Sequence, residues 1–229
     1  MKISFYNSLK NLKKREWVLW ISSMTVIAAS SLIAGSEGIL NTIASLVGVT
    51  ALIFVAKGDA LGQLITIIFS VLYGIISVKF KYYGETITYL CMSAPAAFVS
   101  LIVWIKNPYK DSNEVKVDKL TKSKLVLTVA VSFVASIVFY FILKTLGNAN
   151  LIVSTVSIFT SAFACMLLIL RSPYYAVAYA SNDIVLIILW ILATMDNIKY
   201  LPMILCFTMF LANDLYGFYN WQKMKNRQV

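Results

Sequence analysis

Eight long apolar runs constrain this chain more than any other feature of its sequence. They cover residues 17–34, 38–56, 60–78, 86–105, 125–143, 151–170, 174–194 and 200–221. A helix needs about 20 residues to cross the hydrocarbon core of a bilayer. Within lipid every backbone N–H and C=O group must be paired inside the protein, and a helix does this within one segment. The sequence therefore predicts an all-α integral membrane protein with eight transmembrane helices.

Composition excludes several other classes of protein. Of the 229 residues 60% are hydrophobic and only 13% are charged, about half the charged share of a soluble domain. The net charge is +10, but the basic residues lie in the tails and connections, so we expect the lipid bilayer and not nucleic acid as the partner. There is no histidine, and the three cysteines lack the spacing of metal ligands. We therefore expect neither a cofactor nor a metal site.

The basic residues also predict an orientation. If the N-terminus is inside, sixteen of the twenty Lys and Arg residues lie on the inner side and four on the outer side. This bias is typical of a multi-pass protein of the cytoplasmic (inner) membrane with both termini in the cytoplasm. Residues 1–16 form a basic cytoplasmic tail, which is either solvated or a short helix lying in the membrane interface.

The connection 106–124 divides the single membrane domain into two halves. Residues 38–105 and 151–221 match in hydropathy and loop length when they are displaced by 114 positions. This predicts two three-helix units joined by a linking helix, 125–143, with an extra helix, 17–34, in front. Equivalent helices are four apart, so both units have the same orientation and form a parallel repeat.

Pro95 lies in the middle of the run 86–105, where it removes a backbone hydrogen bond and bends a helix. The bend is either a hinge for gating or a static feature of the packing.

Two acidic residues lie deep inside apolar runs, Asp183 and Asp214, and each follows an asparagine, Asn182 and Asn213. An ionised Asp at the centre of a membrane helix costs about 3 kcal/mol on insertion scales, which favours a functional role. They either contact a substrate or form a hydrogen-bonded clasp between helices.

Helical spacing gathers these polar groups with aromatic side chains. On one face of the run 174–194 we expect Tyr175, Tyr179, Asn182, Leu186 and Trp190. On one face of the last run we expect Asn213, Tyr216 and Asn220. Two such faces make a slot for a flat, polar or cationic ring.

Two milder polar stripes lie in other runs, and each either lines the same path or packs against a helix. One is Gln63, Thr66, Ser70, Tyr73 and Ser77, and the other is Ser154, Ser157 and Ser161. Trp17, Trp20, Trp104 and Trp221 are typical of the aromatic belt at a membrane surface.

These residues also resemble a known family. Asn182-Asp183 with Trp190, followed by Asn213-x-x-Tyr216-Gly217-Phe218-x-Asn220-Trp221, is similar to the C-terminal signature of the PnuC-type vitamin transporters. The resemblance extends over nearly the whole chain. It implies a fold like a doubled SWEET half-transporter, and facilitated diffusion of nicotinamide riboside followed by trapping through cytoplasmic phosphorylation. Other members of the family carry thiamine.

The implied ligand has a cationic ring, a carboxamide and ribose hydroxyls, so we expect stacking, amide pairing and charge compensation from the chain. The expected substrate contacts are Asn182, Asn213, Asp183, Trp190, Tyr216, Gln63, Tyr179, Asn220, Tyr73 and Asp214. Thiamine or a related vitamin is the alternative substrate, and a homo-oligomer is possible. A membrane enzyme that uses the two Asp residues as an acid pair is disfavoured, because the sequence has no histidine and no phosphate-binding loop. A non-transport accessory subunit is the remaining alternative.

Overall fold

The computed structural model describes residues 5–34, 39–79, 86–110, 112–148, 150–196 and 201–228, and helices make up nearly all of them. The helices are α1 (Phe5–Lys10), α2 (Lys14–Ala34), α3 (Ile39–Ala56), α4 (Ala60–Lys79), η2 (Thr88–Ser93), α6 (Ala94–Lys106), α7 (Lys122–Thr145), α8 (Leu151–Ile169), α9 (Tyr175–Asp196) and α10 (Leu201–Gln228).

Within the described residues five helical stretches are long and apolar enough to cross a membrane. They are Thr88–Lys106, Lys122–Thr145, Leu151–Ile169, Tyr175–Met195 and Leu201–Gln228, and two shorter apolar helices are Thr42–Ala56 and Ala60–Ile75. The predicted all-helical class is confirmed, and the number of eight spans stays a prediction.

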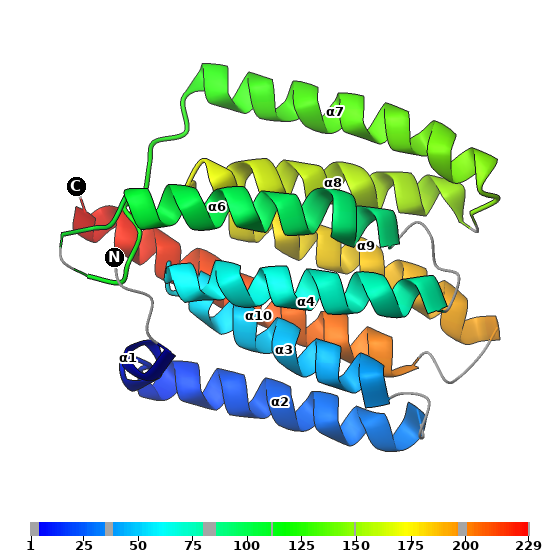
Figure 1. The fold of residues 1–229 in the computed structure, drawn as a ribbon, viewed down its shortest axis with the longest axis horizontal. Coiled ribbons are helices and arrows are strands. Elements are labelled where there is room, and N and C mark those ends of the chain that lie inside the picture. The colour runs from blue at the N-terminus through cyan, green and yellow to red at the C-terminus, as the bar shows by residue number, and fades with distance from the viewer. Residues whose placement is uncertain are drawn as a thin grey trace.

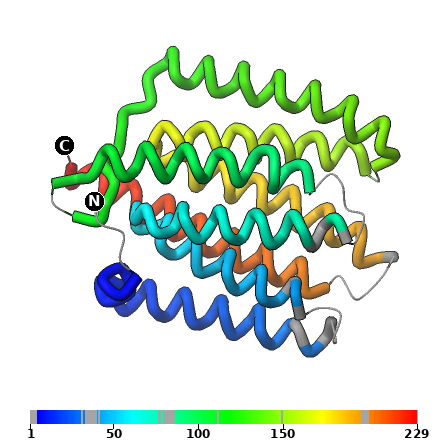
Figure 2. The backbone as a smooth tube through the Cα atoms, viewed as in Figure 1, coloured from blue at the N-terminus to red at the C-terminus, as the bar shows by residue number. Residues whose placement is uncertain are grey.

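The helices lie side by side in one bundle, with α2 and α7 at opposite edges and both chain ends at the same end of the bundle (Figures 1 and 2). Helix α3 packs on α4, α4 on α6, α8 on α9 and α9 on α10, while α10 also contacts α2 and α3. Gly62 allows the close packing of α3 on α4, because a Cβ atom there would lie 2.4 Å from the backbone N of Val55. A side chain at this position would force the two helices apart.

A π-helical turn precedes Pro95. The segment η2 ends at Ser93, and the N–H of Ala94 donates to the carbonyl of Tyr89, five residues back. Pro95 follows at the second residue of α6, inside a helical stretch that continues from Thr88 to Lys106, so its missing N–H takes one donor from the preceding turn. The chain therefore changes its helical winding just before the proline. Whether this place is a hinge or a static bend stays a prediction.

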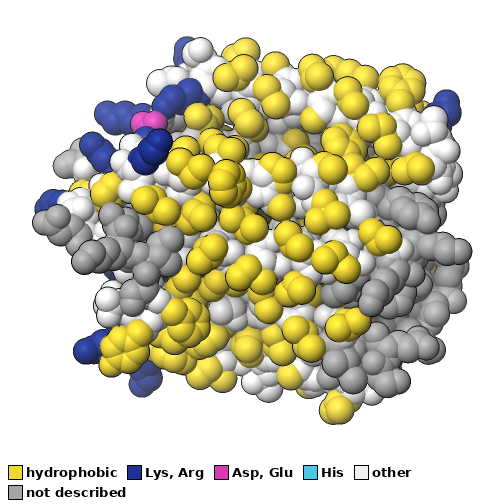
Figure 3. All heavy atoms as spheres, in the orientation of Figure 1, with side chains coloured by type: hydrophobic (Ala, Val, Ile, Leu, Met, Phe, Trp, Pro, Cys, Tyr) yellow, Lys and Arg dark blue, Asp and Glu magenta, His cyan; other side chains and the backbone are white. Residues whose placement is uncertain are grey.

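Hydrophobic and basic side chains occupy different parts of the bundle surface. Figure 3 shows a broad hydrophobic face over the middle of the helices, while most of the visible Lys and Arg side chains gather at the end where α10 finishes. We call this the basic end; it comprises α1, the first turn of α2, the turn 57–59, the segments 107–110 and 112–121, and residues 220–228 of α10. The outward-facing apolar residues of α7, such as Val126 and Phe133, suit contact with lipid.

Two tryptophans correct the prediction of an aromatic belt. Trp104 and Trp221 are both 0% exposed, and their ring centroids lie 5.4 Å apart, so they are core residues and not surface anchors. The reason is that the basic end folds over them: the N–H of Val115, itself fully buried, donates to the carbonyl of Gly58. Trp17, by contrast, is 36% exposed.

Candidate functional site

A cavity of about 440 Å³ lies between the helices, a size within the usual range of about 300–1,000 Å³ for small-molecule sites. Its wall on α8 runs from Ser154 to Leu168, which corresponds to about 21 Å along the helix. The other walls come from α3, α4, η2, the end of α7 with the turn after it, α9 and α10. Both halves of the chain therefore contribute to one cavity.

The predicted face of α9 is confirmed. Its five members all line the cavity: Tyr175, Tyr179, Asn182, Leu186 and Trp190. The serine stripe of α8 lines the same cavity opposite them, through Ser154, Ser157 and Ser161. A period of three and four residues in the sequence therefore identified two of the walls.

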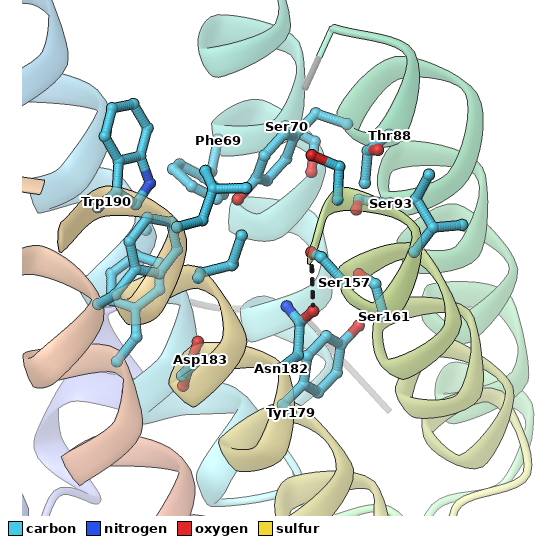
Figure 4. Close-up of a pocket in the computed structure, with 18 of the residues that line it drawn as sticks. Phe69, Ser70, Thr88, Ser93, Ser157, Ser161, Tyr179, Asn182, Asp183 and Trp190 are labelled. Atoms are coloured by element: carbon cyan, nitrogen blue, oxygen red, sulfur yellow. Dashed lines mark hydrogen bonds between the residues drawn. The ribbon is translucent and has the colours of Figure 1, made fainter. Parts of the chain in front are cut away.

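Asn182 is held by two hydroxyl groups of α8. Thr160 Oγ1 donates to Asn182 Oδ1 over 2.8 Å, and Ser157 Oγ donates to the same oxygen over 3.2 Å. Figure 4 shows the Ser157 bond, with the amide nitrogen beside the bonded oxygen. The buried amide is therefore held through its oxygen, and its nitrogen is the atom that these hydroxyls do not engage.

Two carboxyl groups lie in the wall, and each is 4% exposed. Asp183 follows Asn182 on α9, and Asp214 lies on α10. The carboxyl groups of Asp183 and Asp214 are hydrogen-bonded to each other, Asp183 Oδ2 has no donor within the described part of the chain, and the lining residues include no Lys or Arg. Two adjoining buried carboxyl groups are costly when both are charged, so a ligand with a donor or a positive charge would stabilise this wall.

The cavity ends toward the basic end at a set of aromatic rings. The centroids of Tyr175 and Trp221 lie 4.9 Å apart, and Trp221 Nε1 donates to the carbonyl of Val55 over 3.0 Å. Asn220 Nδ2 donates to the carbonyl of Ala56 over 2.9 Å. Because α3 ends at Ala56, neither carbonyl has the usual donor four residues on: that of Val55 accepts from the N–H of Gly58 and from Trp221, and that of Ala56 accepts from Asn220. The Asn220-Trp221 pair therefore caps a helix and closes this end.

A buried ion pair adds a second connection at the same end. Glu16 is 1% exposed, and its side chain accepts from Lys57 Nζ over 2.9 Å and from the hydroxyl of Tyr216 over 2.8 Å. Nearby, Ser8 Oγ donates to Asp59 Oδ2 over 2.5 Å. Burial raises the pKa of Asp59, although the bonds from Ser8 and from the N–H of Leu61 and the charge of Lys57 act in the opposite direction. These bonds connect α1, α2 and α10 to the α3–α4 hairpin.

Five of the ten predicted contact residues line the cavity, namely Tyr179, Asn182, Asp183, Trp190 and Asp214. The other five lie elsewhere in the described structure. Tyr216 bonds to Glu16, and Asn220 bonds to the carbonyl of Ala56. Asn213 Nδ2 donates to Ser23 Oγ over 3.0 Å. The ring of Tyr73 packs on that of Tyr89 with centroids 4.6 Å apart, and Gln63 is fully buried. Direct contact with substrate stays a prediction for all ten.

Sequence reasoning missed the aromatic wall from the other helices. Phe69, Phe207 and Phe210 line the cavity, and the ring of Phe69 lies 6.0 Å from that of Phe210 and 5.6 Å from that of Tyr89. A phenylalanine in an apolar run gives no signal, because the lipid face and the cavity face accept it equally. Thr160 was missed as well, since it does not fall on the serine stripe.

Three comparisons with known proteins agree with this geometry. The family described as "Nicotinamide mononucleotide transporter" matches residues 38–223. The nicotinamide riboside transporter PnuC of Neisseria mucosa is 31% identical over 214 residues, covering 91% of this chain and 81% of that protein. The protein of the same name from Haemophilus influenzae is 23% identical, covering 92% of this chain and 91% of the relative.

The fold has a solved counterpart. A crystal structure of the vitamin B3 transporter PnuC superposes with a TM-score of 0.85 at 28% identity, over 100% of both chains. Together with the apolar helices, these matches show a multi-pass membrane protein and a transporter rather than an enzyme. The chain belongs to the PnuC family of membrane transporters.

Proposed function

We propose that the protein carries nicotinamide riboside across the cytoplasmic membrane by facilitated diffusion, and that phosphorylation in the cytoplasm traps the product. Both termini lie in the cytoplasm in this proposal, so the basic end faces inward. The names of the two relatives support the substrate, and the concentration of basic side chains at one end supports the orientation.

One observation carries the choice of substrate. The cavity wall combines aromatic faces with two carboxyl groups, while its described residues include no Lys or Arg. A pyridinium ring suits such a wall, because aromatic faces and carboxylates both attract a cation. A phosphate ester would place a second anion beside Asp183 and Asp214 without a basic partner. The wall therefore favours the riboside over the mononucleotide that gives the matched family its description.

The proposal includes the finer architecture. Eight helices form two parallel three-helix units, 38–105 and 151–221, with the linking helix 125–143 between them and one extra helix in front. Their shared cavity supports this arrangement, because substrate sites of such repeats lie between the two units. The proposed substrate contacts on the wall are Tyr179, Asn182, Asp183, Trp190 and Asp214. An assembly of several copies is compatible with the exposed apolar faces.

Thiamine is the second candidate, since it is also a flat cation and the same wall would accept it. The two substrates differ in the groups around the ring, so direct competition separates them.

Uptake into liposomes that hold the purified protein tests the proposal. We expect saturable entry of labelled nicotinamide riboside down its gradient, without ATP or an ion gradient, and inhibition by unlabelled riboside but not by the mononucleotide. Saturable entry of thiamine alone would reject the proposed substrate. Accumulation against a gradient that collapses when an ion gradient is removed would reject facilitated diffusion.

A further inference from the structure

The amide of Asn182 offers the cavity one kind of hydrogen-bonding group. Its oxygen already accepts from Thr160 Oγ1 over 2.8 Å and from Ser157 Oγ over 3.2 Å. The residue is 6% exposed, so water has little access to these bonds. The amide nitrogen carries two hydrogens and is not engaged by these hydroxyls; Figure 4 shows it beside the bonded oxygen.

The two hydroxyls come from a different helix than the amide. Thr160 and Ser157 are on α8, whereas Asn182 is on α9. Of the three acceptors within reach of Thr160 Oγ1, the nearest is Asn182 Oδ1; the carbonyls of Ser157 and Val156 lie at 3.0 and 3.1 Å. In this arrangement both hydroxyls direct their protons to the amide oxygen, and the amide nitrogen is left to donate to a ligand.

We propose that Thr160 and Ser157 are positioning residues for substrate recognition: they fix Asn182 as a hydrogen-bond donor to a neutral acceptor on the substrate, a carbonyl or hydroxyl oxygen. This inference rests on the proposed function and deepens it. Asn182 contacts the substrate, and the two hydroxyls act through it. Asp183 Oδ2, for which the described residues supply no donor, is the complementary acceptor on the same wall.

A double-mutant cycle tests the coupling, with the affinity of the purified protein for nicotinamide riboside as the readout. We expect Thr160→Val to weaken binding about fivefold to tenfold, Asn182→Ala to weaken it about tenfold or more, and the double variant to match Asn182→Ala alone. Thr160→Ser keeps the hydroxyl, so it should restore affinity to within about twofold of the unchanged protein.

Thr155→Val is the matched control on α8, because the Thr155 hydroxyl donates to the Leu151 carbonyl of its own helix and does not line the cavity among the described residues. It should leave affinity unchanged. If Thr160→Val has the same effect with and without Asn182, or if Thr160→Ser is as weak as Thr160→Val, the positioning role is wrong. If the unchanged protein does not bind nicotinamide riboside at all, the proposed function fails instead, which keeps the two failures apart.

Discussion

The basic end and the cavity contain similar polar residues, but these residues differ in how fully they are hydrogen-bonded within the protein. At the basic end a carboxylate, an amide and an indole, those of Glu16, Asn220 and Trp221, each bond to a group on another segment. In the cavity Ser70 Oγ is buried without a partner in the described residues, and Asp183 pairs with another acid, Asp214, so that its Oδ2 lacks a donor there. Buried polar groups normally find partners, so we expect a ligand to supply the missing ones on this wall.

This difference indicates which residues of the family signature stabilise the fold and which line the cavity. Asn220 and Trp221 are the last residues of the signature, yet they bond to carbonyls in the last turn of α3. Asn182 and Asp183 form the other part of the signature, and both face the cavity. We therefore expect changes at the basic end to lower stability and changes in the cavity to lower affinity.

The largest effect is expected for Trp221→Ala. The change removes a fully buried ring, its bond to Val55 and its contacts with Trp104 and Tyr175, so we expect a loss of about 3–5 kcal/mol in the free energy of unfolding. Chemical unfolding in detergent measures it. Trp17→Ala, at a partly exposed position, is the control and should cost far less. Equal losses for the two variants would contradict the assignment of Trp221 to the core.

The same change of carboxylate to amide at both places separates stability from binding. Glu16→Gln weakens the bonds to Lys57 and Tyr216, so we expect about 1.5–3 kcal/mol less stability and an unchanged affinity. Asp183→Asn replaces one of two adjoining carboxyl groups with an amide that can donate to Asp214, so stability should stay the same or rise, while affinity for nicotinamide riboside falls about tenfold or more. Thermal unfolding and binding, measured on both variants, check this. If Asp183→Asn destabilises the protein as much as Glu16→Gln does, the assignment of Asp183 to binding and of Glu16 to stability is wrong.

Asn220→Ala should have a smaller effect of the same kind. It leaves the carbonyl of Ala56 without its side-chain donor, which costs about 1–1.5 kcal/mol of stability. Affinity should change by less than about twofold, since Asn220 is not among the described lining residues. Thr208→Val, whose hydroxyl bonds within α10 to Ile204, is the control. A large loss of affinity with unchanged stability would mean that Asn220 contacts the substrate and does not serve mainly as a cap.

Sequence reasoning predicted the parts of this molecule that follow from a single helix. The α9 face was visible because Asn182 and its aromatic neighbours recur at helical spacing in an otherwise apolar run. The hydrogen bonds of Tyr216 and Asn220 could not be predicted from the sequence, because they depend on how α10 packs against α2 and the end of α3. The burial of Trp104 and Trp221 depends on a loop that folds back over them, through Val115. Capping groups and loops that bring distant segments together leave no periodic signal.

The smallest effect concerns a surface cluster of the basic end outside the membrane helices. Asp118 accepts from Lys124 Nζ over 2.6 Å and lies 3.5 Å from Arg171. Burial acts to raise the pKa of Asp118, but these cations and the N–H of Lys119 outweigh it and hold the pKa below the usual carboxyl value. The folded state therefore binds the proton less tightly than the unfolded state. The stabilisation is complete above the ordinary carboxyl pKa and is lost as the pH falls through the lowered one.

Because the Asp118 side chain is 36% exposed, water and salt screen the pair, and we expect no more than about 0.5 kcal/mol from it. Asp118→Asn should lower stability by this amount at about pH 7 and make no difference at about pH 2, where both proteins are uncharged at this position. Unfolding curves of the two proteins at both pH values measure the difference, and high salt should reduce it at the higher pH. A difference that persists at the lower pH would mean that packing, and not charge, holds this cluster. The stability of the basic end would then come from buried contacts, such as the bonds of Asn220 and Trp221 to the end of α3, and not from surface charge. The carboxyl groups of the cavity differ, because we expect them to serve binding and not stability.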